Sequence, residues 1–447
     1  MSRFPMIIFT LPAIVAQTQE LVETPSAKLD AAIKSGQIAW KFSEPEEIVE
    51  LLGKPEKEEI IHDGNEFLTY QYNSDFKVIF SKTQSSSEDR TYFGLFNYTK
   101  DDRSYASILL KEPTKVRNIS DFYKLDLFWG ISGMDASSLD LTKEEKLLRE
   151  MPFDTLTKWP PVEKLPEGIN PTEILESGKN PGLGLRAMHA KGIDGRGIDL
   201  AVIDQPLIPD HLEIKGSFNL IAEMDVQGSR PQMHGPAVTS LAVGKTCGVA
   251  PGANLHYVSM AMWNEKEGNR YYIQALENIL ELNKSKRTNI KAVSISTGMF
   301  RELSQYDIWQ ALLEKAESEG VLVITCDKDA TKLQYALLRP LVGGDRDKPE
   351  GYTGGSFASG GNELLVPGDC RTYASHLGKD VYSYGPHGGM SWVAPWIAGL
   401  AALGFQVNPD IKPAEIRKYL MESATDMPFG KVVNPERFLE MCVAVNQ

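Results

Sequence analysis

The feature that most constrains this chain is an alternation of strongly apolar strands with helices, which begins near Asn180. Four runs have the length and composition of strands buried on both faces, at 197–204, 253–260, 290–297 and 321–326. Helical patterns lie between them at 237–244, 269–285 and 305–320. Such an alternation predicts a doubly wound, mostly parallel α/β sheet with helices on both faces. Functional residues of these sheets gather at the carboxyl ends of the strands.

The part of the chain before this alternation has a different pattern. A short helical segment at 45–54 precedes four segments of strand composition, at 66–72, 76–82, 91–98 and 105–112. They predict a small α+β domain with an antiparallel sheet, in which we find no motif that carries chemistry. The Pro-rich, charged stretch 157–171 is typical of a linker. We therefore expect an N-terminal domain at 17–155, a linker at 156–180 and the α/β domain at 181–447.

The first residues and the overall charge bear on where the protein acts and on its partners. An apolar run from Pro5 to Ala16 follows a single Arg, which predicts a signal peptide at 1–16; an N-terminal strand or a disordered start is the alternative. We expect a secreted or cell-envelope protein, or a cytoplasmic one if this run is not a signal. The net charge of −13, without a long basic run, argues against nucleic acid and anionic membranes as partners. No other run approaches the length of a membrane span.

Three polar residues stand at positions where an α/β sheet places its chemistry. Asp204 ends the first strand, His234 precedes a helix of small residues, and Ser391 follows two glycines at the start of an Ala/Gly-rich apolar helix. Each residue also has a simpler structural explanation: Asp204 could start a turn, His234 could be an ordinary loop residue, and Ser391 could cap the helix. Together, in the order Asp, His, Ser, they match one known order of a serine-protease triad. The four Cys, which contain no CxxC pair, predict neither a zinc site nor a disulfide framework.

Six segments then show a family resemblance. They are similar, in order and spacing, to segments of the subtilisin-like serine peptidases (the S8 subtilases). The segments are GRGIDLAVID, HGPAVTSLAVG, GVAPGANLHYVSM, AVSISTG, GGMSWVAPWIAGLAAL and NPDIKPAEIRKYLMESATD, which start at residues 195, 234, 248, 292, 388 and 408. This resemblance implies that Ser391 attacks the scissile carbonyl, that His234 is the general base and that Asp204 orients His234. It also implies an oxyanion donor in the Ser391 backbone N–H. An extended substrate would pair with Ser296, Thr297 and Gly298.

The sequence departs from the family pattern in places that bear on activity. Gln205 and Pro206 follow the Asp, Pro236 and Ala237 replace two residues of the HGTH motif, and Met390 and Trp392 flank the Ser. The oxyanion-hole Asn is absent: by segment length Asp329 takes its place, with Asp327 as the alternative. An ionised carboxylate repels an oxyanion, so an Asp serves there only when it is protonated.

The leading hypothesis is therefore a serine endopeptidase that acts on peptides or proteins. The alternative is a catalytically weak or inactive subtilase-like protein that binds peptides or proteins through the same groove. A nucleotide- or sugar-binding α/β protein lacks support, since no GxGxxG or P-loop follows a strand. No cofactor is expected to be required; the resemblance implies calcium as a structural ion, but acidic loops such as 343–351 do not assign its ligands.

Overall fold

The computed structural model divides the chain into two compact units, residues 1–114 (unit 1) and 115–447 (unit 2). The residues that it describes are 24–35, 37–38, 45–63, 65–74, 76–84, 91–100, 103–104, 114–123, 130–216, 218–226, 229, 231–262, 269–299, 305–359 and 361–444. The predicted signal peptide and the strand expected at 105–112 lie outside the described residues.

Unit 1 has the antiparallel arrangement that its alternating sequence predicts. Two helices, α1 (Pro25–Ser35) and α2 (Pro45–Leu52), precede a sheet whose strands follow chain order. These strands are β1 (Lys57–Asp63), β2 (Asn65–Asn73), β3 (Phe76–Gln84), β4 (Thr91–Lys100) and β5 (Arg103–Ser104), each antiparallel to the next. Apolar side chains of α1, α2, β2 and β3 form one core, in which Leu29, Ile48 and Phe80 are fully buried.

Unit 2 is built on the predicted parallel sheet, which confirms the α/β fold class. Its strand order is β10 (Phe218–Met224), β11 (Asn254–Met260), β9 (Asp199–Asp204), β12 (Ile290–Ile295) and β13 (Leu322–Thr325). All four strand pairs are parallel. Strand β10 was not predicted, because it lies at the edge of the sheet and most of its side chains are at least partly exposed.

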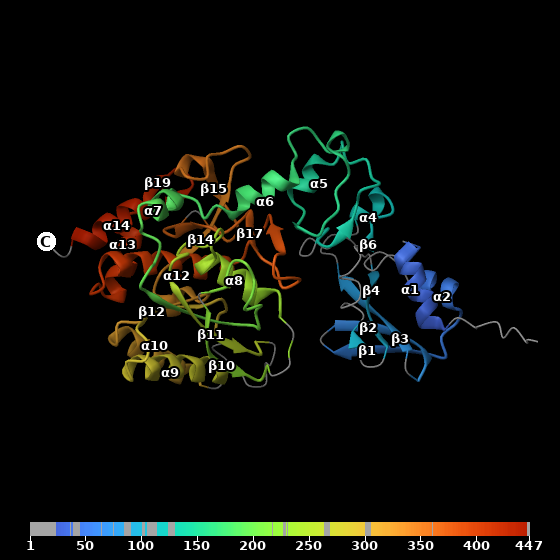
Figure 1. The fold of residues 1–447 in the computed structure, drawn as a ribbon, viewed down its shortest axis with the longest axis horizontal. Helices are drawn as coiled ribbons and strands as arrows, with labels where there is room; N and C mark the ends of the chain where they lie inside the picture. Colours follow the sequence, from blue (N-terminus) through green and yellow to red (C-terminus); the bar gives the residue numbers. More distant parts are fainter. Residues whose placement is uncertain are drawn as a thin grey trace, which may run out of the picture. The chain divides into compact units, whose positions relative to one another are not determined.

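Four helices cover the two faces of this sheet. Helices α8 (His234–Val243) and α12 (Met390–Val407) pack on one face, and α9 (Arg270–Lys284) and α10 (Tyr306–Ser318) on the other, below the sheet in the view of Figure 1. Successive side chains of β9 point to opposite faces of the sheet. Leu200 and Val202 belong to the core under α12, and Ala201 and Ile203 belong to the core under α9.

Helix α12 is the central core helix of unit 2. Its small residues let it approach its neighbours closely: a Cβ at Gly399 would lie 2.7 Å from Cβ of Val249. From the sequence we expect no second run that approaches a membrane span, but among the described residues this helix is long and apolar enough to cross a bilayer by length and composition; 78% of that window is buried inside the protein. Its apolar length is therefore explained by its position in the core.

Two larger sheets, a two-stranded sheet of β6 (Thr114–Lys115) and β7 (Met134–Asp135), and several short helices complete the fold. One of the larger sheets has the order β15 (Tyr352–Gly354), β14 (Tyr335–Pro340), β16 (Leu364–Pro367), β20 (Gly430–Val432) and β19 (Thr425–Met427); the other has the order β17 (Arg371–Ala374), β18 (Tyr382–Gly385) and β8 (Phe153–Asp154). The helices are α4 (Ile119–Tyr123), α5 (Glu145–Arg149), α6 (Pro171–Lys179), α7 (Leu185–Ala190), α11 (Lys328–Thr331), α13 (Pro413–Glu422) and α14 (Pro435–Ala444).

The domain boundary lies about forty residues earlier than the sequence analysis placed it, after residue 114 and not after 155. Strand β8, in the segment assigned to the N-terminal domain, pairs with β18 of unit 2. The stretch expected to be a linker is also packed: Leu165 and Ile169 are buried, and α6 lies against β17. The prolines that suggested a flexible connection stand in ordered structure between these contacts.

Candidate active site

Asp204 lies at the carboxyl end of the central strand β9, as predicted, and its side chain is fully buried. The imidazole Nδ1 of His234 is 2.8 Å from its Oδ1 and 3.0 Å from its Oδ2, and the backbone N–H of Gln205 donates to Oδ1 at 2.8 Å. A carboxylate only accepts, so Nδ1 carries the proton and Nε2 of His234 keeps its lone pair. The arrangement thus fixes the tautomer that a general base requires.

His234 is the first residue of α8, and its side chain is 17% exposed. Burial disfavours the imidazolium, but the negative charge of Asp204 and the hydrogen bond to it favour that form more strongly, so the pKa of His234 is raised above its usual value. The indole of Trp392 lies edge-on to the imidazole, with ring centroids 5.8 Å apart. Trp392 directly follows Ser391, so this contact brings the start of α12 to His234.

Ser391 lies in the first turn of α12, but its side chain does not cap the helix. The N-cap is Gly389, and the Ser391 hydroxyl donates to the backbone carbonyl of Ser296 at 3.0 Å. The Ser296 hydroxyl donates in return to the backbone carbonyl of Ser391, also at 3.0 Å. No hydrogen bond joins His234 to Ser391 in this described part of unit 2. The structure therefore brings Asp204 and His234 together and joins Ser391 to the end of β12.

Of the two glycines before Ser391, Gly388 has a steric explanation, whereas a Cβ at Gly389 would come no closer than 3.9 Å to another atom. A Cβ at Gly388 would lie 2.3 Å from the backbone oxygen of Gly368, so only glycine fits this approach. The backbone N–H of Gly388 donates to Oδ1 of Asp369 at 2.7 Å. In the first turn the N–H of Trp392 donates to the carbonyl of the N-cap Gly389 at 2.8 Å, whereas the N–H of Ser391, at the second helical position, has no carbonyl partner within the helix. This helix end is therefore suited to an anionic group beside the hydroxyl.

The segment after β13 carries Asp327 and Asp329, the two residues predicted for the oxyanion position. Asp327 is the N-cap of α11, where its carboxylate accepts the N–H groups of Asp329 and Ala330. Asp329 is exposed, and its Oδ1 accepts from Nε2 of Gln334 at 3.4 Å. The contact from this segment to Ser391 comes from Cys326, whose Sγ is 3.9 Å from the Ser391 hydroxyl. Sequence reasoning missed Cys326, although its place directly after a parallel strand was a usable signal.

The thiol of Cys326 is not a competing nucleophile. Burial, with a smaller contribution from the charge of Asp204, raises the pKa of Cys326 to about 12. A thiol with this pKa is protonated at neutral pH, and the thiolate is the reactive form. The hydroxyl of Ser391, which a general base such as His234 can activate, is the better candidate of the two.

The predicted substrate-pairing residues lie beside this group. Thr297 and Gly298 are partly exposed, and Ser296 is buried. The carbonyl of Thr297 accepts the N–H of Cys326 at 3.0 Å, so the ends of β12 and β13 are held together here. A Cβ at Gly298 would meet only the backbone nitrogen of Asp327, at 4.0 Å, which leaves open space over this residue.

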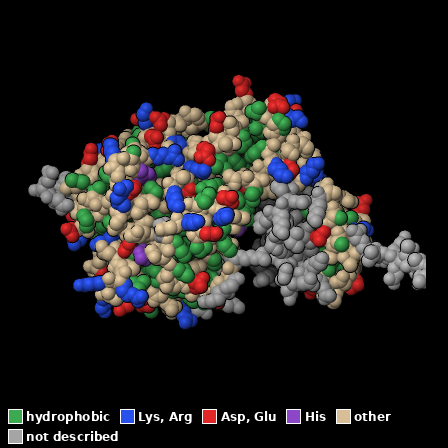
Figure 2. Space-filling view, viewed as in Figure 1, with side chains coloured by type: hydrophobic (Ala, Val, Ile, Leu, Met, Phe, Trp, Pro, Cys, Tyr) green, Lys and Arg blue, Asp and Glu red, His purple; other side chains and the backbone are tan. Residues whose placement is uncertain are grey.

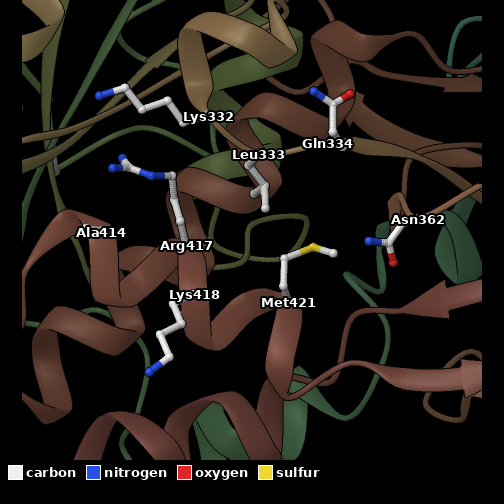
Figure 3. Close-up of a pocket in the computed structure, with 8 residues that line it drawn as sticks. All are labelled: Lys332, Leu333, Gln334, Asn362, Ala414, Arg417, Lys418 and Met421. Carbon is white, nitrogen blue, oxygen red and sulfur yellow. The ribbon is translucent and has the colours of Figure 1, made fainter.

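Other features of unit 2 do not include Asp204, His234 or Ser391. A pocket of about 370 Å³ (Figure 3) is formed between α13 and the chain that follows α11; it is lined by Lys332, Leu333, Gln334, Asn362, Ala414, Arg417, Lys418 and Met421. Acidic and basic side chains are interspersed over the visible face of unit 2 (Figure 2). Within the ranges that the structure describes, no group of three or more His, Cys, Asp or Glu side chains is placed to hold a metal ion, so no calcium site is assigned.

Comparison with known proteins gives similarity over the same region. The model of the subtilase family (Peptidase_S8) matches residues 195–327 and 353–438. The chain is 25% identical over 252 residues to Subtilisin BL from Lederbergia lenta, which covers 54% of this chain and 88% of that protein. It is 24% identical over 252 residues to Subtilisin E from Bacillus subtilis (strain 168), covering 54% of this chain and 63% of that protein.

A solved structure also aligns with the chain. It is a chain from "Structural basis of subtilase cytotoxin SubAB assembly", with a TM-score of 0.47 and 18% sequence identity, covering 60% of this chain and 96% of that one.

Proposed function

This chain belongs to the subtilase family of serine peptidases, and on that premise we propose that it is a serine endopeptidase in which Asp204, His234 and Ser391 form the catalytic triad. The observation that carries the proposal is the hydrogen bond between buried Asp204 and His234, with the first turn of α12 against the imidazole. Nothing in the packing of the fold requires a buried carboxylate, an oriented imidazole and a helix-start serine together. Their joint presence supports a role in chemistry.

The reaction begins with a rotation of the Ser391 side chain. Its hydroxyl leaves the carbonyl of Ser296 and turns toward Nε2 of His234, a change between staggered rotamers. His234 then removes the proton as Ser391 attacks the scissile carbonyl, and the imidazolium formed is stabilised by Asp204. His234 protonates the leaving amine, and water hydrolyses the acyl-enzyme by the same steps.

Stabilisation of the oxyanion is the weakest part of this site. The Ser391 backbone N–H supplies one donor. The second donor expected in the family, an Asn side chain, is absent, and Asp329 stays the sequence-based prediction for that position. Loss of one oxyanion donor costs a factor of roughly 10²–10³ in turnover. We therefore expect a slow enzyme.

The test of the proposed function is the mapping of cleavage products. The purified full chain is incubated with an unfolded protein, and the fragments are sequenced by mass spectrometry. An endopeptidase yields internal fragments, whose formation stops with a serine-directed inhibitor. Intact substrate, at enzyme concentrations that allow many slow turnovers, would contradict the proposal.

The pH dependence of activity follows from the raised pKa of His234. The imidazole must be neutral to accept the proton, so kcat/KM is expected to rise with pH through that pKa. The midpoint is expected above about 6.5, the usual value for histidine. The contribution of the His234–Asp204 interaction to folding stability changes in the opposite direction to kcat/KM. It is fully present below the pKa of His234 in the unfolded state and is lost as pH rises through the pKa in the folded state. A kcat/KM profile over pH 5 to 9 checks this; a midpoint below 6 would contradict it.

A second candidate function is peptide or protein binding without efficient catalysis. Two observations favour it: the Ser391 hydroxyl is bonded to Ser296 and not to His234, and the family's oxyanion Asn is missing. Tight binding of uncleaved peptides by the wild-type protein, with no covalent adduct at Ser391, would select this candidate.

The proposal extends to location and partners. Export from the cell rests on the apolar run Pro5–Ala16 alone, and N-terminal sequencing of the mature protein tests it. Proteins or peptides are the proposed substrates, and no cofactor is proposed for the reaction.

A further inference from the structure

The loop that leads into the nucleophile, residues 386–389 (the nucleophile loop), joins β18 to α12. Its backbone is fixed at two points. The carbonyl of Pro386 accepts the N–H of Cys370 at 3.1 Å, and the N–H of Gly388 donates to Asp369 at 2.7 Å. The side chain of His387, which lies between these two points, contacts Glu150, a residue far away in the sequence.

His387 and Arg339 are both bound by the carboxylate of Glu150, the residue directly after α5. Nε2 of His387 is 2.7 Å from Oε2 of Glu150, and Nη2 of Arg339 is 2.7 Å from Oε1. Nη1 of Arg339 completes the group by donating to the carbonyl of Pro386 at 3.1 Å and to Nδ1 of His387 at 3.3 Å. Because a guanidinium only donates, Nδ1 of His387 accepts and Nε2 is the donor to Glu150.

We infer that Glu150 is a positioning residue for Ser391, acting through His387 and Arg339 on the nucleophile loop. This inference rests on the proposed function. Ser391 lies four residues after His387, and its attack requires alignment that a small displacement of the preceding loop disturbs. Glu150 and Arg339 both lie outside the residues that the family model matches, so this connection is not part of the matched pattern.

The side chains of Glu150, Arg339 and His387 are all partly exposed, which bears on how much their ion pairs stabilise the fold. Glu150 is 38% exposed, Arg339 25% and His387 47%. Ion pairs this exposed contribute little to folding stability. Removing Glu150 is therefore expected to leave a folded protein whose nucleophile loop is less well held.

The test compares variants of the full chain. Glu150→Ala is expected to lower kcat by roughly 10- to 100-fold with KM nearly unchanged. Glu150→Gln keeps one acceptor oxygen and is expected to lie between wild type and Glu150→Ala. His387→Ala removes the other end of the same connection, so the double variant should lose no more than the single ones. The matched control is Glu145→Gln, which removes an ion pair with Arg149 within α5 and should behave as wild type.

Amide hydrogen exchange separates failure of this inference from failure of the proposed function. Faster exchange at residues 388–391 is expected in Glu150→Ala but not in Glu145→Gln, whether or not the protein cleaves peptides. An active wild type with kcat unchanged in Glu150→Ala would overturn the inference alone, and so would unchanged exchange. An inactive wild type would overturn the proposed function, and the exchange result would still decide the role of Glu150.

Discussion

Ser391→Ala is expected to lower kcat for peptide hydrolysis by roughly 10⁶-fold, the loss typical when a triad nucleophile is removed. The hydroxyl is the expected nucleophile because His234 can act as its general base, whereas burial raises the pKa of the neighbouring Cys326 thiol and disfavours its thiolate. The fold should persist, since the change removes the hydrogen bond to Ser296, which contributes about 1 kcal/mol, and the long contact with the Cys326 thiol. Steady-state kinetics and the thermal unfolding midpoint measure the two effects.

The matched control for this variant is Ser294→Ala, on the same strand β12. Ser294 is fully buried and its hydroxyl has no hydrogen-bond partner among the residues that the structure describes, so its removal should leave kcat unchanged. Activity that survives Ser391→Ala within tenfold of wild type, in protein free of contaminating protease, would exclude Ser391 as the nucleophile.

Asp204→Asn is expected to lower kcat by about 10⁴-fold. The carboxylate now accepts from both the N–H of Gln205 and Nδ1 of His234. An amide retains one acceptor oxygen and adds an NH₂ donor, which favours the lone pair on Nδ1 and places the proton on Nε2, where it blocks the base. Kinetics of the folded variant measure the loss.

The same substitution also changes the pH dependence. Without the charge of Asp204, burial dominates and lowers the pKa of His234, so the midpoint of the residual activity should move to lower pH than in wild type. The control is Asp199→Asn, at the other end of β9. The carboxylate of Asp199 accepts the N–H of Asn289, so this substitution should leave both kcat and the pH midpoint unchanged. If Asp204→Asn kept the wild-type kcat and the wild-type midpoint of the pH profile, Asp204 would not orient His234.

Local pattern was sufficient to predict the α/β core of unit 2, and it indicated Asp204, His234 and Ser391 as candidate residues. Strands that are apolar on both faces belong to a sheet covered by helices on both faces, so β9, β11, β12 and β13 were recognisable, although β13 lies at the edge of the sheet. Asp204 and His234 follow from the rule that parallel strands bring their carboxyl ends to one edge. Ser391 was recognisable because glycines and small residues surround it.

The features that were missed depend on contacts between distant parts of the chain. Strand β8 has two residues and forms only by pairing with β18, so no pattern at 153–154 signals it, and the domain boundary was placed too late. The position of Asp329 was inferred from segment length, which does not reveal that Asp327 caps a helix there and that Cys326 contacts Ser391. The link from Glu150 to His387 spans more than 200 residues and leaves no local signal.

The most direct test of the central claim is covalent labelling of the wild-type full chain with a fluorophosphonate, followed by peptide mapping of the adduct. The account predicts one adduct per chain, located on Ser391, with a labelling rate that rises with pH through the pKa of His234. Folded protein that gives no adduct between pH 5 and 9, or that carries it on another residue, would contradict the assignment of Ser391 as an activated nucleophile.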